Sequence, residues 1–134
     1  MEEGALTWID DIGTYLQTNS IGTLGNDIFY NGFDASVSNC ITLLNAPGLS
    51  ERCSLQRSMI LSRPELDIRV RNVDDSTAET KAKAIHDLLS LVGTQIIGST
   101  HFKKIRPLQD CYFLETDEND RYIYVINFQC EINR

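Results

Sequence analysis

The chain has 134 residues, of which 42% are hydrophobic and 23% charged. This length and composition are typical of a globular protein that buries a core of its own, and we expect a single domain over residues 1–134. No apolar run approaches the roughly 18 residues of a membrane-spanning helix, and the acidic opening Met1-Glu2-Glu3 is unlike a secretory signal. We therefore expect neither a membrane protein nor an exported one.

Acidic side chains outnumber basic ones by nineteen to twelve, which gives a net charge of −7. Binding to a phosphate backbone requires clustered Lys and Arg, so this balance argues against a protein that wraps a nucleic acid. It does not exclude DNA passing nearby, because a conduit benefits from a surface that repels its cargo.

Cysteine usage indicates reduced thiols. Cys40, Cys53, Cys111 and Cys130 form no CxxC pair. In a chain made without export, such residues are typical of core thiols rather than of disulfides or zinc ligands.

Residues 5–18 are predicted to form the first helix, because apolar side chains cover roughly half of the helical wheel. These side chains are Trp8, Ile9, Ile12, Tyr15 and Leu16. Asp11 lies on the opposite, polar arc. An apolar arc this wide suggests that the helix packs against two partners. Trp8 and Tyr15 lie either at the edge of the core or against a neighbouring subunit, because aromatic side chains are enriched at subunit interfaces.

The next segments are predicted to be strands. A short strand around Ile28–Tyr30 is followed by a strand over residues 39–45, which Pro47-Gly48 is expected to end. Residues 50–64 show mixed periodicity that assigns no element, and a loop reaching out of the domain is one interpretation.

The segment ELDIRVRNV, residues 65–73, alternates with a period of two. Leu66, Ile68 and Val70 point to one face, while Asp67, Arg69 and Arg71 point to the other. A strand with one buried and one polar face is therefore expected here.

A second amphipathic helix follows. Ser76-Thr77-Ala78-Glu79 is typical of a capping box at the start of the helix. Gly93 is expected to supply a left-handed stop. The apolar stripe between them consists of Ala78, Ala82, Ile85, Leu89 and Val92.

The remaining chain is predicted to form hairpins. Gln95–Ile97 and His101–Ile105 flank a Gly98-Ser99 turn, Pro107 interrupts the ladder, and Cys111–Leu114 resume it. Residues 117–120 form the tip before a last strand over residues 121–132. In that strand Ile123 and Val125 make the outer face apolar at its start, so part of this face is expected to be covered.

This order of elements predicts an α+β fold. We expect an antiparallel-rich or mixed β-sheet of about four to five strands, with two helices packed mainly on one face.

The search for chemistry finds little. His86 lies at the margin of the apolar stripe and His101 begins a strand, and neither has a nucleophile or orienting carboxylate at a recognisable spacing. The acidic cluster at residues 115–120 lacks the glycine and final glutamate of an EF-hand, so a solvated hairpin tip is preferred. We expect no catalytic residue, cofactor or metal site, and no enzyme.

Two runs carry a resemblance. RVRNVDDSTAETKAKAIHDLL and IRPLQDCYFLETDENDRYIYVINFQCEI resemble the small minor capsid proteins of tailed bacteriophages and are similar to the tail terminators of long-tailed phages. The resemblance covers about residues 21–132 and includes no catalytic signature.

The resemblance implies a subunit that closes into a ring, often a hexamer, at the head-proximal end of the tail tube. Such a ring stops tube growth and presents a face for head attachment. The implied partners are further copies of the chain, the major tail tube protein and a head-completion or connector protein, while DNA passes through the ring lumen without specific binding. The implied location is the virion tail or neck, with assembly in the host cytoplasm and no membrane partner.

In such a ring, aromatic and charged side chains are the expected subunit contacts. The candidates are Trp8, Tyr15, Arg69, Arg71, Asp117, Glu118 and Asp120. If exposed, the two arginines are either solvated or meet the acidic hairpin tip of the next subunit.

Other interpretations stay open. A head-closure or connector protein of the phage neck forms rings at the same junction, and the sequence does not separate the two roles. A regulatory α+β module that binds a small ligand would need a concave apolar pocket, for which the partly apolar outer sheet face is the hint.

Overall fold

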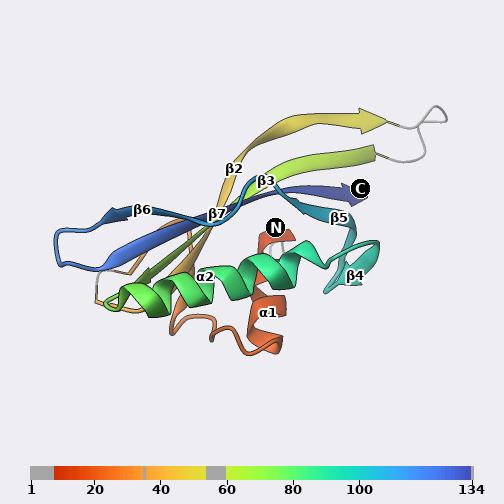
Figure 1. The fold of residues 1–134 in the computed structure, drawn as a ribbon. Helices are drawn as coiled ribbons and strands as arrows, with labels where there is room; N and C mark the ends of the chain where they lie inside the picture. Colours follow the sequence, from red (N-terminus) through yellow and green to blue (C-terminus); the bar gives the residue numbers. More distant parts are fainter. Residues whose placement is uncertain (1–7, 35, 54–59, 134) are drawn as a thin grey trace.

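The computed structural model describes residues 8–34, 36–53 and 60–133 (Figure 1). Two helices, α1 (Trp8–Thr18) and α2 (Asp75–Ser90), lie on one side of a curled β-sheet. The strands are β1 (Ile28–Tyr30), β2 (Cys40–Cys53), β3 (Ile60–Asn72), β4 (Gln95–Ile97), β5 (Thr100–Pro107), β6 (Tyr112–Thr116) and β7 (Tyr122–Asn133). The predicted α+β class is confirmed.

Within the described residues the sheet has seven strands, in the order β1-β2-β3-β7-β5-β4, and β6 pairs with β7 beside this path. The pairing of β1 with β2 is parallel and the other pairings are antiparallel, so the sheet is mixed. The expected four to five strands were too few. The three-residue strands β1 and β4 pair with β2 and β5 as separate strands of the sheet. β6 is a further strand, which pairs with the first residues of β7.

The core lies between the sheet and the helices. Alternate residues of β3 and β7 face α2, and Phe128 and Leu66 are fully buried there. The stripe Ala78, Ala82, Ile85 and Leu89 of α2 is likewise buried, as the helical period predicted. Each fully buried Leu, Ile or Phe side chain contributes roughly 1.5–3 kcal/mol relative to exposure, so this layer dominates the stability of the fold.

The start of α2 differs from the predicted capping box. Asp74 is the N-cap, and its carboxylate accepts hydrogen bonds from the Thr77 backbone N–H at 2.9 Å and the Thr77 hydroxyl at 2.6 Å. These two bonds lower the pKa of Asp74. Glu79 instead pairs with Lys83 at 3.4 Å along the helix. A carboxylate caps as well as a serine and also interacts with the helix dipole, so the cap falls two residues earlier.

The end of α2 also differs from the prediction. The helix ends at Ser90 with Leu91 in a right-handed conformation, and the Val92 N–H bonds to the Leu89 carbonyl at 3.1 Å. Gly93 does not have a positive φ, so it is not a left-handed stop. The chain leaves the helix through a tightened last turn instead.

β2 continues past the predicted end at Pro47 as far as Cys53. Two register shifts against β3, between Ala46 and Leu49 and between Leu49 and Arg52, accommodate the proline. Beyond Leu43 the β1 ladder has ended, so Pro47 lies where a missing N–H is tolerated. Much of the segment 50–64 is therefore a strand hairpin rather than a loop, while residues 54–59 lie outside the described residues.

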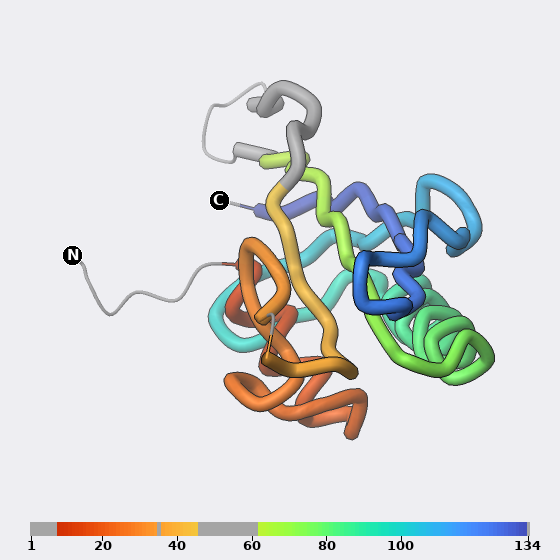
Figure 2. Tube along the Cα trace, turned by 90° about the vertical axis from the view of Figure 1, so that its left-hand side faces the viewer, coloured from red at the N-terminus to blue at the C-terminus, as the bar shows by residue number. Residues whose placement is uncertain are grey.

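The sheet curls so that α1, on one face, contacts strands near both of its edges. α1 contacts β2 near one edge and β4 at the other. Figure 2 shows the β4–β5 turn beside α1, with α2 farther away. Asp11 is central to this contact. It is buried rather than on a solvated arc, and its carboxylate accepts hydrogen bonds from the Thr100 hydroxyl and from the Ser99 N–H at 3.3 Å.

Candidate assembly surfaces

The seven predicted contact residues lie in three separate places. Trp8 and Tyr15 lie on α1, Arg69 and Arg71 on β3, and the acidic residues at the β6–β7 turn. The structure brings Arg71 and Asp117 together within one chain and leaves the other groups apart.

Trp8 and Tyr15 are half-buried and pack against the core. Trp8 also borders an open hollow on the surface. That hollow is lined by Trp8, Ile9, Asp10, Tyr30, Asn31 and Asn45. Burial, and then the Asp10 carboxylate, raise the pKa of the Tyr30 phenol. The two aromatic residues therefore lie at the edge of the core, and their contact with a neighbouring subunit stays a prediction.

The sequence led us to expect that Arg71 is exposed, and this is wrong. Only 5% of its surface is accessible. Its guanidinium donates to the backbone carbonyls of Asp34 at 2.7 Å and Val37 at 2.6 Å. It also lies 4.4 Å from the centre of the Phe33 ring and 3.9 Å from the Asp117 carboxylate. The connection between β1 and β2 thus folds over the outer face of the sheet and covers this arginine.

Arg69 is the accessible member of the pair. Its side chain is 40% exposed and lies 3.5 Å from the Asp67 carboxylate. Burial raises the pKa of Asp67, although the Arg69 charge opposes this. Arg69 therefore remains a candidate contact residue.

The acidic tip is organised by Asp117. Its carboxylate accepts the backbone N–H groups of Asn119 and Arg121, each at 2.9 Å, and the Arg121 Nε at 2.8 Å. Burial raises the pKa of Asp117, but these hydrogen bonds outweigh it and lower the pKa overall. Glu118 and Asp120 are exposed. Asp117 therefore closes its own hairpin, while its two neighbours face solvent.

Sequence analysis missed an exposed aromatic surface on β6. Tyr112, Phe113 and Leu114 are 40%, 47% and 39% exposed. A register shift between Phe113 and Glu115 inserts Leu114 as an extra residue, so three consecutive side chains remain accessible. β6 pairs only with β7 in the described part of the chain, which makes it an edge strand.

The same edge is anchored to α2. The Phe113 ring lies 5.6 Å from that of Tyr124, and the Tyr124 hydroxyl donates to the Asp75 carboxylate at 2.6 Å. This hydrogen bond, together with burial, raises the pKa of Tyr124 to about 12. The aromatic surface is therefore connected to the start of α2 through Tyr124 and Asp75.

A second surface missed by the sequence reasoning is basic. In β5, Lys103 and Lys104 are both exposed between the buried Phe102 and Ile105. A register shift against β7 at this point makes Lys103 the extra residue. A pattern of strict alternation would have buried one of these lysines.

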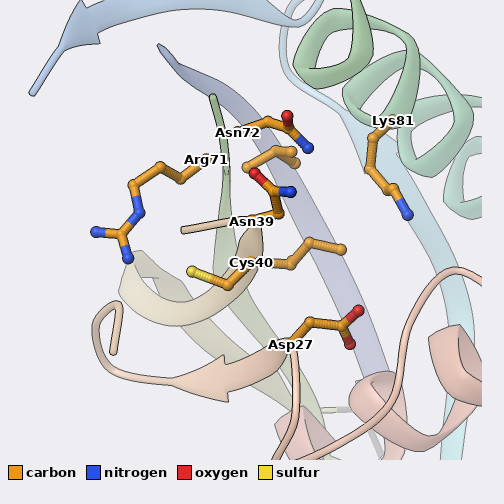
Figure 3. A pocket seen from close by; sticks show the side chains of 8 residues that line it. Asp27, Asn39, Cys40, Arg71, Asn72 and Lys81 are labelled. Atoms are coloured by element: carbon orange, nitrogen blue, oxygen red, sulfur yellow. The ribbon is translucent and has the colours of Figure 1, made fainter. Parts of the chain in front are cut away.

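A small cavity lies where β2, β3 and α2 meet (Figure 3). Its polar lining includes Asp27, Asn39, Asn72 and Lys81, and Lys81 donates to the Ile21 carbonyl at 2.9 Å. With a volume of about 50 Å³ it has room for water, but a drug-sized ligand needs roughly 300–1,000 Å³. At the apolar start of the outer face, Ile123 and Val125 are buried, so this face is covered. The open hollow beside Trp8 has a volume of about 480 Å³, and a second open hollow beside Ile21 and Lys81 has about 370 Å³.

The surroundings of His86 and the metal-ligating residue types bear on the remaining site predictions. His86 packs on the Phe128 ring and lies 3.4 Å from Asp87, but the nearby Ser90 hydroxyl donates to the His86 backbone carbonyl instead of the ring. No group of three or more His, Cys, Asp or Glu side chains within residues 8–34, 36–53 and 60–133 could hold a metal ion.

Three of the four cysteines, Cys40, Cys111 and Cys130, are free thiols. Cys40 and Cys130 are buried and Cys111 is half-buried, and burial raises the pKa of Cys130 to about 12. The side chain of Cys53 lies outside the described ones. Neither α1 nor α2, the two helices among the described residues, has the length and apolar character that a membrane span requires.

Comparison with known proteins agrees with this architecture. A chain in the solved structure "Virion of native gene transfer agent (GTA) particle" superposes with a TM-score of 0.66 over 98% of this chain and 100% of that chain. The two sequences are 12% identical, so the likeness shows a shared fold. No curated protein matches the chain. The profile of the family described as "Bacteriophage tail terminator protein" matches residues 15–134, and the chain therefore belongs to the bacteriophage tail terminator family.

Proposed function

We propose that the protein forms a ring, most simply a hexamer, at the head-proximal end of the phage tail tube, where it stops tube growth and supports head attachment. The observation that carries this proposal is the family match over residues 15–134. The fold shared with a chain of a gene transfer agent virion supports it, as does the accessible edge strand β6.

The physical task explains why a ring suits this role. A tube grows because each added ring exposes a fresh copy of the same face, which is a head-to-tail contact that never closes on itself. A ring that matches the tube on one side and differs on the other stops this growth. One face then binds the major tail tube protein, and the other binds a head-completion or connector protein.

The net charge of −7 suits a ring around DNA. A lumen lined with acidic side chains repels the phosphate backbone, so DNA passes through without being held. In this proposal DNA is cargo and not a ligand, and the protein acts without catalysis in the virion after assembly in the host cytoplasm.

The test is a null mutant of the phage, together with electron microscopy of the purified protein. We expect rings in the micrographs, and in the mutant we expect filled heads without tails and tubes of uncontrolled length or unable to join heads. Tails of normal length together with heads that leak DNA would overturn the terminator role and favour a head-closure protein.

A thermal-shift screen addresses the regulatory alternative. A small molecule that stabilises the monomer specifically would support a ligand-binding module, whereas a ring protein should show stability that rises with its own concentration.

A further inference from the structure

One end of the molecule combines exposed apolar and acidic side chains. We call it the acidic end, and it consists of Tyr112, Phe113, Leu114, Glu115 and Glu118. Both glutamates are exposed and make no hydrogen bond or ion pair with the described residues. Adjacent aromatic and acidic side chains on an edge strand form a surface that stays soluble alone but favours a partner.

Another surface combines exposed apolar and basic side chains. We call it the basic end, and it consists of Leu91, Ile96, Lys103 and Lys104. Leu91 is 83% exposed and Ile96 is 61% exposed. Glu131 lies opposite Lys104 on β7, but these two side chains form no ion pair within the described structure, so both lysines remain available.

The two ends lie far apart along the same strand. Glu115 lies opposite Ile123 and Lys104 lies opposite Glu131, so about 26 Å of β7 separates them at roughly 3.3 Å per residue. Figure 1 shows β6 toward one end of the molecule and the β4–β5 hairpin toward the opposite end. An extended molecule with unlike patches at opposite ends is suited to head-to-tail contact.

We propose that the acidic end of one copy binds the basic end of the next copy, and that repetition of this contact closes the ring. The proposal rests on the proposed function, which it deepens by naming the subunit contact. It replaces Arg71 as a partner of the acidic tip, because that arginine is buried within its own chain.

The two ends match in kind as well as in charge. Tyr112, Phe113 and Leu114 supply an apolar centre for Leu91 and Ile96, as in subunit interfaces with an apolar core and a polar rim. Glu115 and Glu118 then face Lys103 and Lys104 at the rim, where opposite charges set orientation and exclude like-to-like pairing. Because the contact joins two different surfaces, its repetition closes into a ring when the rotation between neighbouring copies divides a full turn evenly.

A charge exchange tests the contact. Variant A carries Lys103→Glu and Lys104→Glu, so both of its ends are acidic. Variant B carries Glu115→Lys and Glu118→Lys, so both of its ends are basic. We expect each variant alone to associate at least about tenfold more weakly than the wild type at low salt. An equimolar mixture should recover ring formation, because A and B can alternate around an even-numbered ring with every contact matched.

Analytical ultracentrifugation and electron microscopy measure these outcomes, and circular dichroism confirms that each variant is folded. Lys83→Glu is the control for a basic side chain elsewhere, since Lys83 is exposed on α2. We expect Lys83→Glu to leave association unchanged, whereas the single change Lys104→Glu should weaken it.

The outcomes separate this contact from the ring itself. If wild-type rings form and A and B also form rings alone, the contact is wrong while the proposed function stands. If A and B form rings but fail to cap tubes, the two ends face the tube protein and the proposal is overturned. If both variants fail alone and the mixture also fails, charge pairing between copies is not what joins them. If the wild type forms no rings, even at the tube end, the proposed function itself fails.

Discussion

The Asp11 carboxylate, in the first turn of α1, accepts a hydrogen bond from the Thr100 hydroxyl at the start of β5. The Ser99 backbone N–H and hydroxyl donate to the same carboxylate oxygen at 3.3 and 3.5 Å. One buried acid thereby holds the first helix against the hairpin at the β4 edge of the curled sheet. Ile96, Lys103 and Lys104 of the basic end lie on this hairpin, so their position depends on Asp11.

We expect Asp11→Ala to destabilise the protein, because it leaves the Thr100 and Ser99 donors without an acceptor. The loss should be about 1–3 kcal/mol, read from the midpoint of urea unfolding. Thr14→Ala on the exposed face of the same helix is the control and should change stability by less than about 0.5 kcal/mol. Equal effects of the two changes would show that Asp11 does not anchor the hairpin.

Gly98 and Gly93 flank β4 and provide a second comparison. Gly98 has φ +60°, and a Cβ there would overlap the Asp11 carboxylate. We expect Gly98→Ala to cost about 1–3 kcal/mol, because both the backbone and the carboxylate must adjust. Gly93 has open space around its Cα and no positive φ, so Gly93→Ala should be neutral or slightly stabilising. Thermal unfolding of the two variants decides this, and a neutral Gly98→Ala would contradict the close contact.

Local periodicity predicted much of this fold. The alternation of Leu66, Ile68 and Val70 predicted β3, and the stripe from Ala78 to Leu89 predicted α2, because a one-sided core imposes its period on the chain. The resemblance to phage tail terminators also led to the correct family.

The cap of α2 was misplaced by only two residues, but the larger errors occur where a residue's surroundings come from parts of the chain that are distant in sequence. Arg71 is buried by carbonyls of residues 34 and 37, and Asp11 by residues 99 and 100, and neither contact leaves a local pattern. The two bulges have a similar effect, because an inserted residue at Leu114 or Lys103 ends the period-two alternation. Both ends of the proposed contact were missed for this reason.

Asp74 should contribute stability that depends on pH. Its pKa is lowered in the folded protein from the ordinary value of 3.8, so its contribution is present above that value and disappears as the pH falls through the folded pKa. We expect Asp74→Ala to be less stable than the wild type at pH 7, and the difference to shrink as the pH falls below 3.8 and through the lower folded pKa. Ser76→Ala should have a smaller effect at pH 7. If Ser76→Ala proves the more damaging change in urea unfolding, the cap is at Ser76 after all.

Trp8 tests the second predicted contact. If Trp8 faces a neighbouring subunit, Trp8→Ala should weaken association by about tenfold or more and leave circular dichroism nearly unchanged, because Ile12 and Leu16 remain fully buried. Sedimentation measures the association, and Thr14→Ala again serves as the control. Loss of the folded state would instead place Trp8 in the core, and unchanged association would remove it from the interface.

The last prediction separates the two arginines of β3. Arg71→Gln removes the guanidinium group, which donates to two backbone carbonyls and packs on the Phe33 ring. The carbonyls of Asp34 and Val37 then lose these hydrogen bonds. We expect a loss of about 2–3 kcal/mol in the free energy of unfolding. Arg69→Gln is the matched change on an exposed side chain and should cost less than about 1 kcal/mol. It follows that Arg69 can be tested as a subunit contact by substitution alone, whereas substitution of Arg71 also disturbs the fold. If Arg71→Gln proved as mild as Arg69→Gln, the connection between β1 and β2 would not depend on Arg71 for its place over the sheet.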